Sequence, residues 1–273
     1  MGYKNLLDLH THTDNSFDGN HSAVFLCETA VEKGLRGVAF TDHVEMDSFR
    51  ERDFDITARQ SYFESAKARS AFRGRLIVCT GVELGQPTYS PRESEDLVHR
   101  YSYDIVVGSI HNLRGEKDFY FMNFSEFAPE EVTALLQAYY DELLLLAQWG
   151  KADVLAHLTY PLRYICGKYG VPVDPADCAE RLDAVLEAAV KNRLALEINA
   201  SSLRGGLGTT TPDEGVVRRF RELGGKHITV CSDAHHAEDL GAGLAQGLDM
   251  ALRCGFTHTT LYQGREPMPV EIC

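Results

Sequence analysis

Short apolar, β-branched runs alternate along the chain with longer segments that have apolar residues at helical spacing. The runs predict strands at Lys4–His10, Arg36–Thr41, Arg75–Glu83, Asp104–Ile110, Asp153–His157, Leu194–Asn199 and His227–Ser232, with Thr257–Tyr262 as a candidate closing edge. The longer segments predict helices at Ser22–Lys33, Ile56–Phe72, Pro129–Gln148, Pro175–Lys191, Asp213–Leu223 and Leu240–Arg253. Repeated strand–helix–strand units favour an α/β fold with a parallel sheet or barrel.

The sequence predicts a single domain over residues 1–273. No linker rich in Pro, Gly or Ser divides it, and 273 residues suit a single α/β barrel, which often reaches about 250 residues. The least regular segments are Gln86–Tyr103 and Leu113–Phe127, which we expect to be loops over one rim.

Potential metal ligands stand at the carboxyl end of nearly every predicted strand. They occur in the segments Asp8–His12, Thr41–His43, Gly81–Glu83, Ser109–His111, Ala156–His157, Glu197–Asn199 and Ser232–His235. In parallel barrels this end carries the active site. Residues two apart on a strand share a face, so His10 can converge with His12 and Asp233 with His235. Imidazole and carboxylate groups without cysteine suit Zn, Fe or Mn, and so many ligands indicate a multinuclear centre of the kind used in phosphoester hydrolysis.

Charge and cysteine content narrow the function classes. The formal net charge is −13, which argues against a broad basic surface for long nucleic acid or anionic lipid. Seven scattered cysteines without a C-x-x-C pair predict reduced thiols in a cytoplasmic protein. We find no signal-peptide pattern, and the longest apolar run, Leu143–Ala147, is too short to cross a bilayer.

The order of these motifs resembles the PHP (polymerase and histidinol phosphatase) superfamily. The matching pattern runs from the H-x-H pair at His10 through T-D-H, G-x-E, S-x-H and a later histidine to Ser232-Asp233-Ala234-His235. Asp18 within Ser16–Gly19, the segment Glu197–Ser201 with Arg204, and Ile228–His235 are similar to the histidinol-phosphatase branch. The resemblance implies a distorted (βα)7 barrel, TIM-like, with up to three divalent metals at the carboxyl mouth of the strands.

Carried over to this chain, the resemblance implies three ligand sets. The first comprises His10, His12, Glu83 and Asp233. The second shares Glu83 and adds His111 and His157. The third comprises Asp18, His43 and His235. His157 departs from the common pattern because no acidic residue follows it two positions on, so the partner of its second ring nitrogen is open.

The expected substrate is a small phosphate monoester, most simply L-histidinol phosphate. Arg163 and Arg204 follow strand-end ligands and are candidates to clamp the phosphate with paired hydrogen bonds. Glu197 and Asn199 should both face the barrel interior, Glu197 as an acceptor for the cationic part of the substrate. Asp42 is expected to orient a ligand histidine or a bound water. His236 is the candidate general acid.

Two other functions remain open at this point. One is a PHP nuclease or nucleotide phosphatase acting on mononucleotides or short oligonucleotides. The other is a non-catalytic metal-binding module. The oligomeric state and the native metal do not follow from the sequence.

Overall fold

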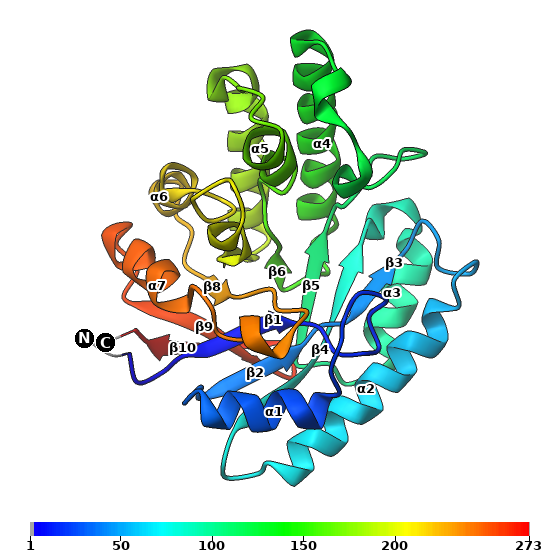
Figure 1. Cartoon of the computed structure of the whole chain (residues 1–273), viewed down its shortest axis with the longest axis vertical. Coiled ribbons are helices and arrows are strands. Elements are labelled where there is room, and N and C mark those ends of the chain that lie inside the picture. The colour runs from blue at the N-terminus through cyan, green and yellow to red at the C-terminus, as the bar shows by residue number, and fades with distance from the viewer. Residues whose placement is uncertain (1–2, 273) are drawn as a thin grey trace.

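Parallel strands form a sheet that curls into a distorted barrel (Figure 1). The computed structural model describes residues 3–272. The parallel strands are β1 (Leu7–Thr11), β2 (Gly37–Phe40), β3 (His43–Glu45), β4 (Ile77–Gly85), β5 (Ile105–Ser109), β6 (Val154–Leu155), β7 (Ala195–Asn199) and β8 (Ile228–Cys231). Their order is β1-β2-β4-β5-β6-β7-β8, with β3 also paired to β4. The predicted (βα)7 barrel is confirmed.

The ring closes between β1 and the segment after β8. The His12 amide donates to the Ala234 carbonyl at 2.9 Å, and the Asp233 amide donates to the His10 carbonyl at 3.1 Å. Below them, the buried Asp8 carboxylate accepts the amides of Ser232 and Gly241, each at 2.8 Å. Asp8 therefore holds the two edges together from outside the barrel, a role that its place among the strand-end residues did not reveal.

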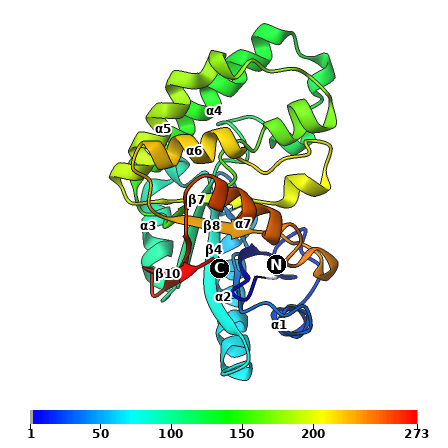
Figure 2. The ribbon, with the colours of Figure 1, turned by 90° about the vertical axis from the view of Figure 1, so that its left-hand side faces the viewer.

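Helices cover the outside of the barrel (Figures 1 and 2). They are α1 (Ala23–Glu32), α2 (Phe54–Ala71), α3 (Pro91–Arg100), α4 (Pro129–Trp149), α5 (Ala179–Lys191), α6 (Glu214–Glu222) and α7 (Leu244–Arg253). Side-chain caps define several starts: the Ser22 hydroxyl accepts the Phe25 amide, and the Asp213 carboxylate accepts the Val216 amide. Such caps satisfy amides that have no partner within the helix.

A β-hairpin closes the amino-terminal end of the barrel. Strands β9 (His258–Gln263) and β10 (Glu266–Glu271) pair only with each other, antiparallel. Leu261, Tyr262 and Val270 pack against interior residues of the parallel strands, among them Leu9 and Ile105. The expectation that Thr257–Tyr262 forms a closing edge is therefore wrong: Pro267 and Pro269 suit β10 to a two-stranded edge, and the pair plugs the barrel.

The segment Gln86–Tyr103 is not a loop, because it contains helix α3. Pro91 occupies the first turn, where a missing amide costs nothing. The helix PRESEDLVHR carries few apolar residues, of which Leu97 and Val98 are buried. So short an apolar stripe gives too weak a periodicity to predict the helix.

A register irregularity between Asp8 and Thr11 changes the face that β1 presents. Leu7 and Leu9 pack into the barrel interior, and His10 nevertheless also points inward, as its contact with Glu83 shows. A bulge of this kind re-aims side chains at the end of a strand. It places His10 and His12 at the mouth above the apolar interior.

Two further findings concern the described residues as a whole. Within residues 3–272 no helix combines the length and the apolar character needed to cross a membrane. The six cysteines in this range are all free.

Candidate metal centre

Glu83, at the end of β4, lies at the middle of a ring of histidines in the barrel mouth. Its Oε1 atom is 3.1 Å from Nε2 of both His111 and His157. Its Oε2 atom is 2.8 Å from Nδ1 of His43 and 3.2 Å from Nε2 of His10. The Glu83 carboxylate is fully buried, so all of these contacts exclude bulk water.

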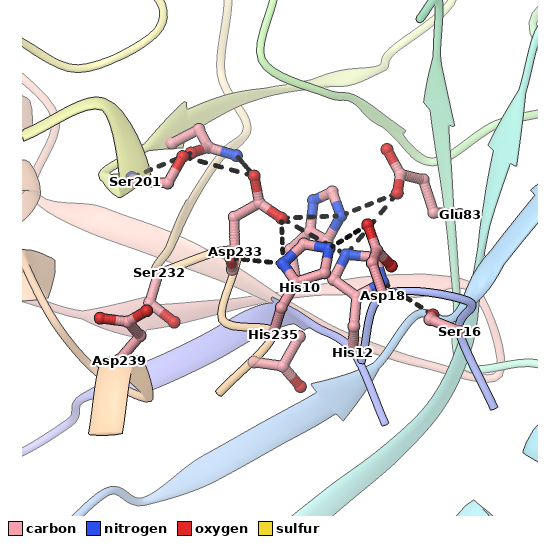
Figure 3. A network of polar contacts seen from close by, with 12 residues as sticks. His10, His12, Ser16, Asp18, Glu83, Ser201, Ser232, Asp233, His235 and Asp239 are labelled. Atoms are coloured by element: carbon pink, nitrogen blue, oxygen red, sulfur yellow. Dashed lines mark hydrogen bonds and ion pairs between the residues drawn. The ribbon is translucent and has the colours of Figure 1, made fainter. Parts of the chain in front are cut away.

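Asp233 faces Glu83 across His10 and His12, as Figure 3 shows. Its Oδ1 atom is 3.3 Å from Nε2 of His12 and 3.9 Å from Nε2 of His10. The two carboxylates thus approach the same pair of imidazoles. This arrangement brings together the first expected ligand set.

The outer edge of the cluster consists of His43, His235 and Asp18. Nε2 of His235 is 3.4 Å from Asp18 Oδ2 and 3.5 Å from Nε2 of His43. The Asp18 side chain is 43% exposed, whereas that of His43 is 9% exposed. This set lies at the solvent side of the centre, and His43 links it to Glu83.

Two of these residues stand on unusual backbone. His157 has φ 21° and Asp233 has φ 53°, both in the region that side chains other than glycine avoid. At each position the carboxyl end of a short strand turns its side chain toward Glu83 or His12. Backbone strain of this kind is typical of functional sites, where the surrounding structure holds it in place.

The chemistry of the cluster fits metal ions. Nε2 of His10 and His12 and Oε2 of Glu83 are buried, yet none has a hydrogen-bond partner among residues 3–272. Each of these three residues offers a ligand atom within 4.8 Å of the others, and the same holds for His43, Glu83 and His111 and for His12, His43 and His235. Buried polar atoms without partners are costly, and a shared cation removes that cost.

The charges of the cluster are strongly coupled. Burial opposes the charged form of His43, but Glu83 and Glu45 outweigh it and raise its pKa to about 10. Burial likewise opposes charge on His10, and Glu197 and Glu83 raise its pKa well above the usual value. Burial, with His235 and His43 nearby, holds the pKa of His12 well below the usual value.

The carboxylates respond in the opposite direction. Burial alone would raise their pKa values, but the neighbouring imidazoles hold the pKa of Glu83 and of Asp233 well below the usual range. Contacts with His235 and His43 lower the pKa of Asp18 to about 2 in the same way. These carboxylates stay ionised at any pH at which the protein functions, as metal ligands must.

Several side chains hold the ligand histidines by their second ring nitrogen. Glu197 Oε1 is 2.7 Å from His10 Nδ1, and Glu45 Oε1 is 3.0 Å from His111 Nδ1. The Ser16 hydroxyl is 3.1 Å from His12 Nδ1. Such contacts fix the ring orientation and leave the other nitrogen free for a metal. Sequence reasoning missed Glu45 and Ser16, although Glu45 lies two residues after His43 on the same strand.

Glu197 and Asn199 do face the interior, as expected, but they contact the protein. The second oxygen of Glu197 accepts the His157 amide at 2.8 Å, and Asn199 donates to Glu197 and Asp233, each at 3.1 Å. Glu197 is 1% exposed. One Glu197 oxygen therefore contacts His10 and the other accepts the His157 amide, so neither oxygen is free to accept a substrate cation.

Asp42 acts one step further from the centre. Its carboxylate accepts the Thr13 amide and the hydroxyls of Thr13, Ser16 and Ser61. Among residues 3–272, its hydrogen bonds connect it to His12 through the Ser16 hydroxyl. The expected orienting role thus passes through a serine hydroxyl.

The two arginines differ in their surroundings. Arg163 lies beside the cluster: one terminal nitrogen is 3.5 Å from Asp233 Oδ2, and its Nε donates to the Ser202 hydroxyl at 3.1 Å. Arg204 donates to the Ser232 carbonyl at 2.9 Å and pairs with Asp239 at 3.2 Å. Only Arg163 contacts an expected metal ligand.

Comparison with known proteins shows the family. The family model described as PHP domain matches residues 8–201. The chain belongs to the PHP family. "Probable histidinol-phosphatase" of Clostridium acetobutylicum is 26% identical over 252 residues, covering 91% of this chain and 94% of that protein. "Histidinol-phosphatase" of Lactococcus lactis is 25% identical over 261 residues and covers 94% of each chain.

A solved phosphatase structure shares the fold. It is the histidinol phosphate phosphatase of Lactococcus lactis complexed with zinc, L-histidinol and phosphate, with a TM-score of 0.81 and 22% identity. The match covers 96% of this chain and 98% of that one. The barrel therefore has the same fold as that phosphatase.

Two further points of the sequence analysis concern His236, the candidate general acid, and the second ring nitrogen of His157. His236 is exposed, and its only hydrogen-bond contact among residues 3–272 is a 3.4 Å contact with Asn20, so nothing brings it to the ligand cluster. Nδ1 of His157 is buried without a partner in the described chain. The missing acidic residue after His157 has thus not been replaced by another side chain.

Proposed function

We propose that this protein is a metal-dependent phosphate monoester hydrolase whose substrate is L-histidinol phosphate. The observation that carries the proposal is the buried Glu83 carboxylate within 3.2 Å of four imidazoles. Two of the ring nitrogens that face it, His10 Nε2 and His43 Nδ1, lack a hydrogen-bond partner among residues 3–272. The names of the relatives point to the same reaction, and the solved phosphatase structure of the same fold is complexed with zinc, L-histidinol and phosphate. We further propose the cytoplasm as its location, on the strength of its free cysteines.

We propose up to three divalent metals, zinc, iron or manganese, in the expected sets. His10, His12, Glu83 and Asp233 would hold one, Glu83 with His111 and His157 a second, and Asp18 with His43 and His235 a third. Metals of this class polarise phosphoryl oxygens and lower the pKa of bound water. The Glu83 carboxylate, which faces both inner sets, would be shared between them.

Side chains of the protein orient the candidate metal ligands and Arg163. Glu197 holds His10 and Glu45 holds His111 through Nδ1, which keeps Nε2 of each ring toward Glu83. Arg163, at the side of Asp233, is placed to donate to phosphate oxygens as a planar fork. Ser201 and Asn199, which also contact Arg163, keep its guanidinium at this position.

We assign to Asp118 the role that was expected of Glu197, which is to accept the cationic part of the substrate. Asp118 is partly exposed, and its Oδ1 accepts the Tyr160 hydroxyl at 3.0 Å and the Tyr120 amide at 2.7 Å. The Tyr160 ring lies 4.9 Å from the ring of His157 and 5.2 Å from that of His111. The Asp118 carboxylate therefore stands one aromatic ring away from the centre, where it would accept the ammonium group of the substrate.

A substrate panel tests the proposal and separates it from the two alternatives. Phosphate release is measured from L-histidinol phosphate, nucleoside 5′-monophosphates, a short oligonucleotide and phenyl phosphate. We expect L-histidinol phosphate to have the highest kcat/KM, and Asp118→Asn to raise KM for it while leaving phenyl phosphate unchanged. Preference for nucleotides would favour the nucleotide phosphatase, and no turnover of any substrate by metal-loaded protein would favour the non-catalytic module.

A further inference from the structure

A hollow of about 420 Å³ lies at the end of the barrel opposite to the metal centre. It is formed where the chain passes from α5 into β7 and from α6 into β8, with Pro267 of β10 at its side. Its lining consists of Val190, Lys191, Arg193, Leu194, Phe220, Gly224, Gly225, Lys226, His227 and Pro267. Its volume falls within the roughly 300–1,000 Å³ that is typical of small-molecule sites.

The polar part of this lining is basic. It includes Lys191, Arg193 and Lys226, and none of the described residues that line the hollow is acidic. Within residues 3–272, none of these three side chains makes a hydrogen bond or ion pair. His227 lines the same hollow, and its pKa is lowered by burial and then by the charges of Lys226 and Arg193.

The lack of ion-pair partners concerns the three cations of the hollow and does not extend to other charged residues of the neighbouring helices. On the same helices Arg219 pairs with Asp183 at 2.8 Å, and Glu214 pairs with both Arg218 and Arg253. The whole chain has a formal charge of −13. Three unpaired cations around one concave surface of an acidic protein repel one another and attract an anion.

The base of the hollow is apolar. Phe220 and Leu194 are buried beneath it, and Gly225 lets the Phe220 ring pack close to the backbone, since an added Cβ would come within 2.4 Å of that ring. Val190 and Pro267 are the apolar lining residues that are accessible. The hollow therefore combines an apolar wall with a cationic rim. That combination suits a ligand that has one apolar part and one anionic part.

We propose that this hollow is a second binding site, which takes a small anion bearing a carboxylate or phosphate group on a flat apolar body. Lys191, Arg193 and Lys226 would bind the anionic group, and the apolar body would lie against Val190 and Pro267. The site is built from residues that precede β7 and β8, so it is separate from the ligands that follow these strands. It does not depend on the proposed function.

Calorimetric titration of the metal-loaded protein with 1-naphthalenesulfonate tests the proposal. This probe has the required charge and shape and is not hydrolysed. We expect one equivalent to bind, and the double variant Arg193→Ala/Lys226→Ala to bind at least about tenfold more weakly, since each lost charge-assisted contact costs roughly that factor. The matched control is Arg59→Ala/Lys67→Ala, which removes two exposed cations from α2 that have no side-chain partner in the described chain.

Binding by the control should equal that of the wild type, and phosphatase activity should be retained by both variants. The neutral analogue 1-naphthalenemethanol should bind at least about tenfold more weakly than the sulfonate, because the cations do not attract it. Equal binding by the two double variants would overturn the proposal, as would equal binding of the neutral and charged probes. Failure of the wild type to bind the sulfonate would also overturn it.

Discussion

At the scale of single residues, Glu83 and Asp18 are expected metal ligands with unequal surroundings. Glu83 contacts several imidazoles in a buried position, whereas Asp18 contacts His43 and His235 at the exposed edge. We expect Glu83→Gln to lower kcat by at least about a hundredfold, and Asp18→Asn to lower it by only about tenfold. Steady-state kinetics with metal analysis of both variants checks this. Equal losses would contradict the sharing of Glu83 between two sites.

The two arginines give a second residue-scale prediction. Arg163→Ala should lower kcat/KM by roughly ten- to a hundredfold, because one charge-assisted clamp on phosphate is lost. Arg163→Lys should recover only part of this, since an ammonium cannot supply two parallel hydrogen bonds. Arg204→Ala should cost less, because Arg163 lies 3.5 Å from the expected ligand Asp233, whereas Arg204 contacts the Ser232 carbonyl and Asp239. A larger loss for Arg204→Ala at unchanged metal content would reverse these assignments.

At the scale of elements, the β9–β10 hairpin acts as a plug and not as part of the site. Leu261 is 4% exposed and packs in the barrel interior with Leu9 and Ile105. Leu261→Ala should lower the free energy of unfolding by about 2–4 kcal/mol through the cavity that it leaves. Urea unfolding measures this. The activity per bound metal should stay at the wild-type value, and a selective loss of activity in the folded variant would show that the plug also shapes the centre.

The strands and helices also show how much of the fold and of the candidate site the sequence could predict. The parallel barrel and the gathering of the candidate ligands in one mouth could be predicted from the position of His, Asp and Glu at strand ends, because parallel strands bring these ends together. Alternation alone could not place His10 or His157: a bulge re-aims the first, and positive φ turns the second. Helix α3 and the partners Glu45 and Ser16 were missed because their signals depend on tertiary contacts.

At the scale of the whole molecule, the stability of the metal-free protein should depend on pH through the histidines of the site. His43 has its pKa raised from 6.5 to about 10, and the pKa values of His10 and His111 are also raised, against the lowered pKa of His12. A raised pKa stabilises the fold fully below the unfolded value of 6.5, and this contribution is lost as pH rises toward 10.

We therefore expect the metal-free protein to lose stability as pH rises above 6.5, whereas metal binding strengthens because protons no longer compete for the imidazoles. Urea midpoints of the metal-free and metal-loaded forms between pH 6.5 and 9 measure the difference, which should widen with pH. A difference that narrows would contradict the assignment of these histidines as ligands.

The central claim is that metal held by the Glu83 cluster hydrolyses L-histidinol phosphate. The most direct measurement is phosphate release from this substrate by protein whose metal content is determined before chelation, after chelation and after reconstitution with Zn, Fe or Mn. The account predicts two or three equivalents of metal, loss of turnover on chelation and its return on reconstitution. Full turnover by chelated, metal-free protein would contradict it.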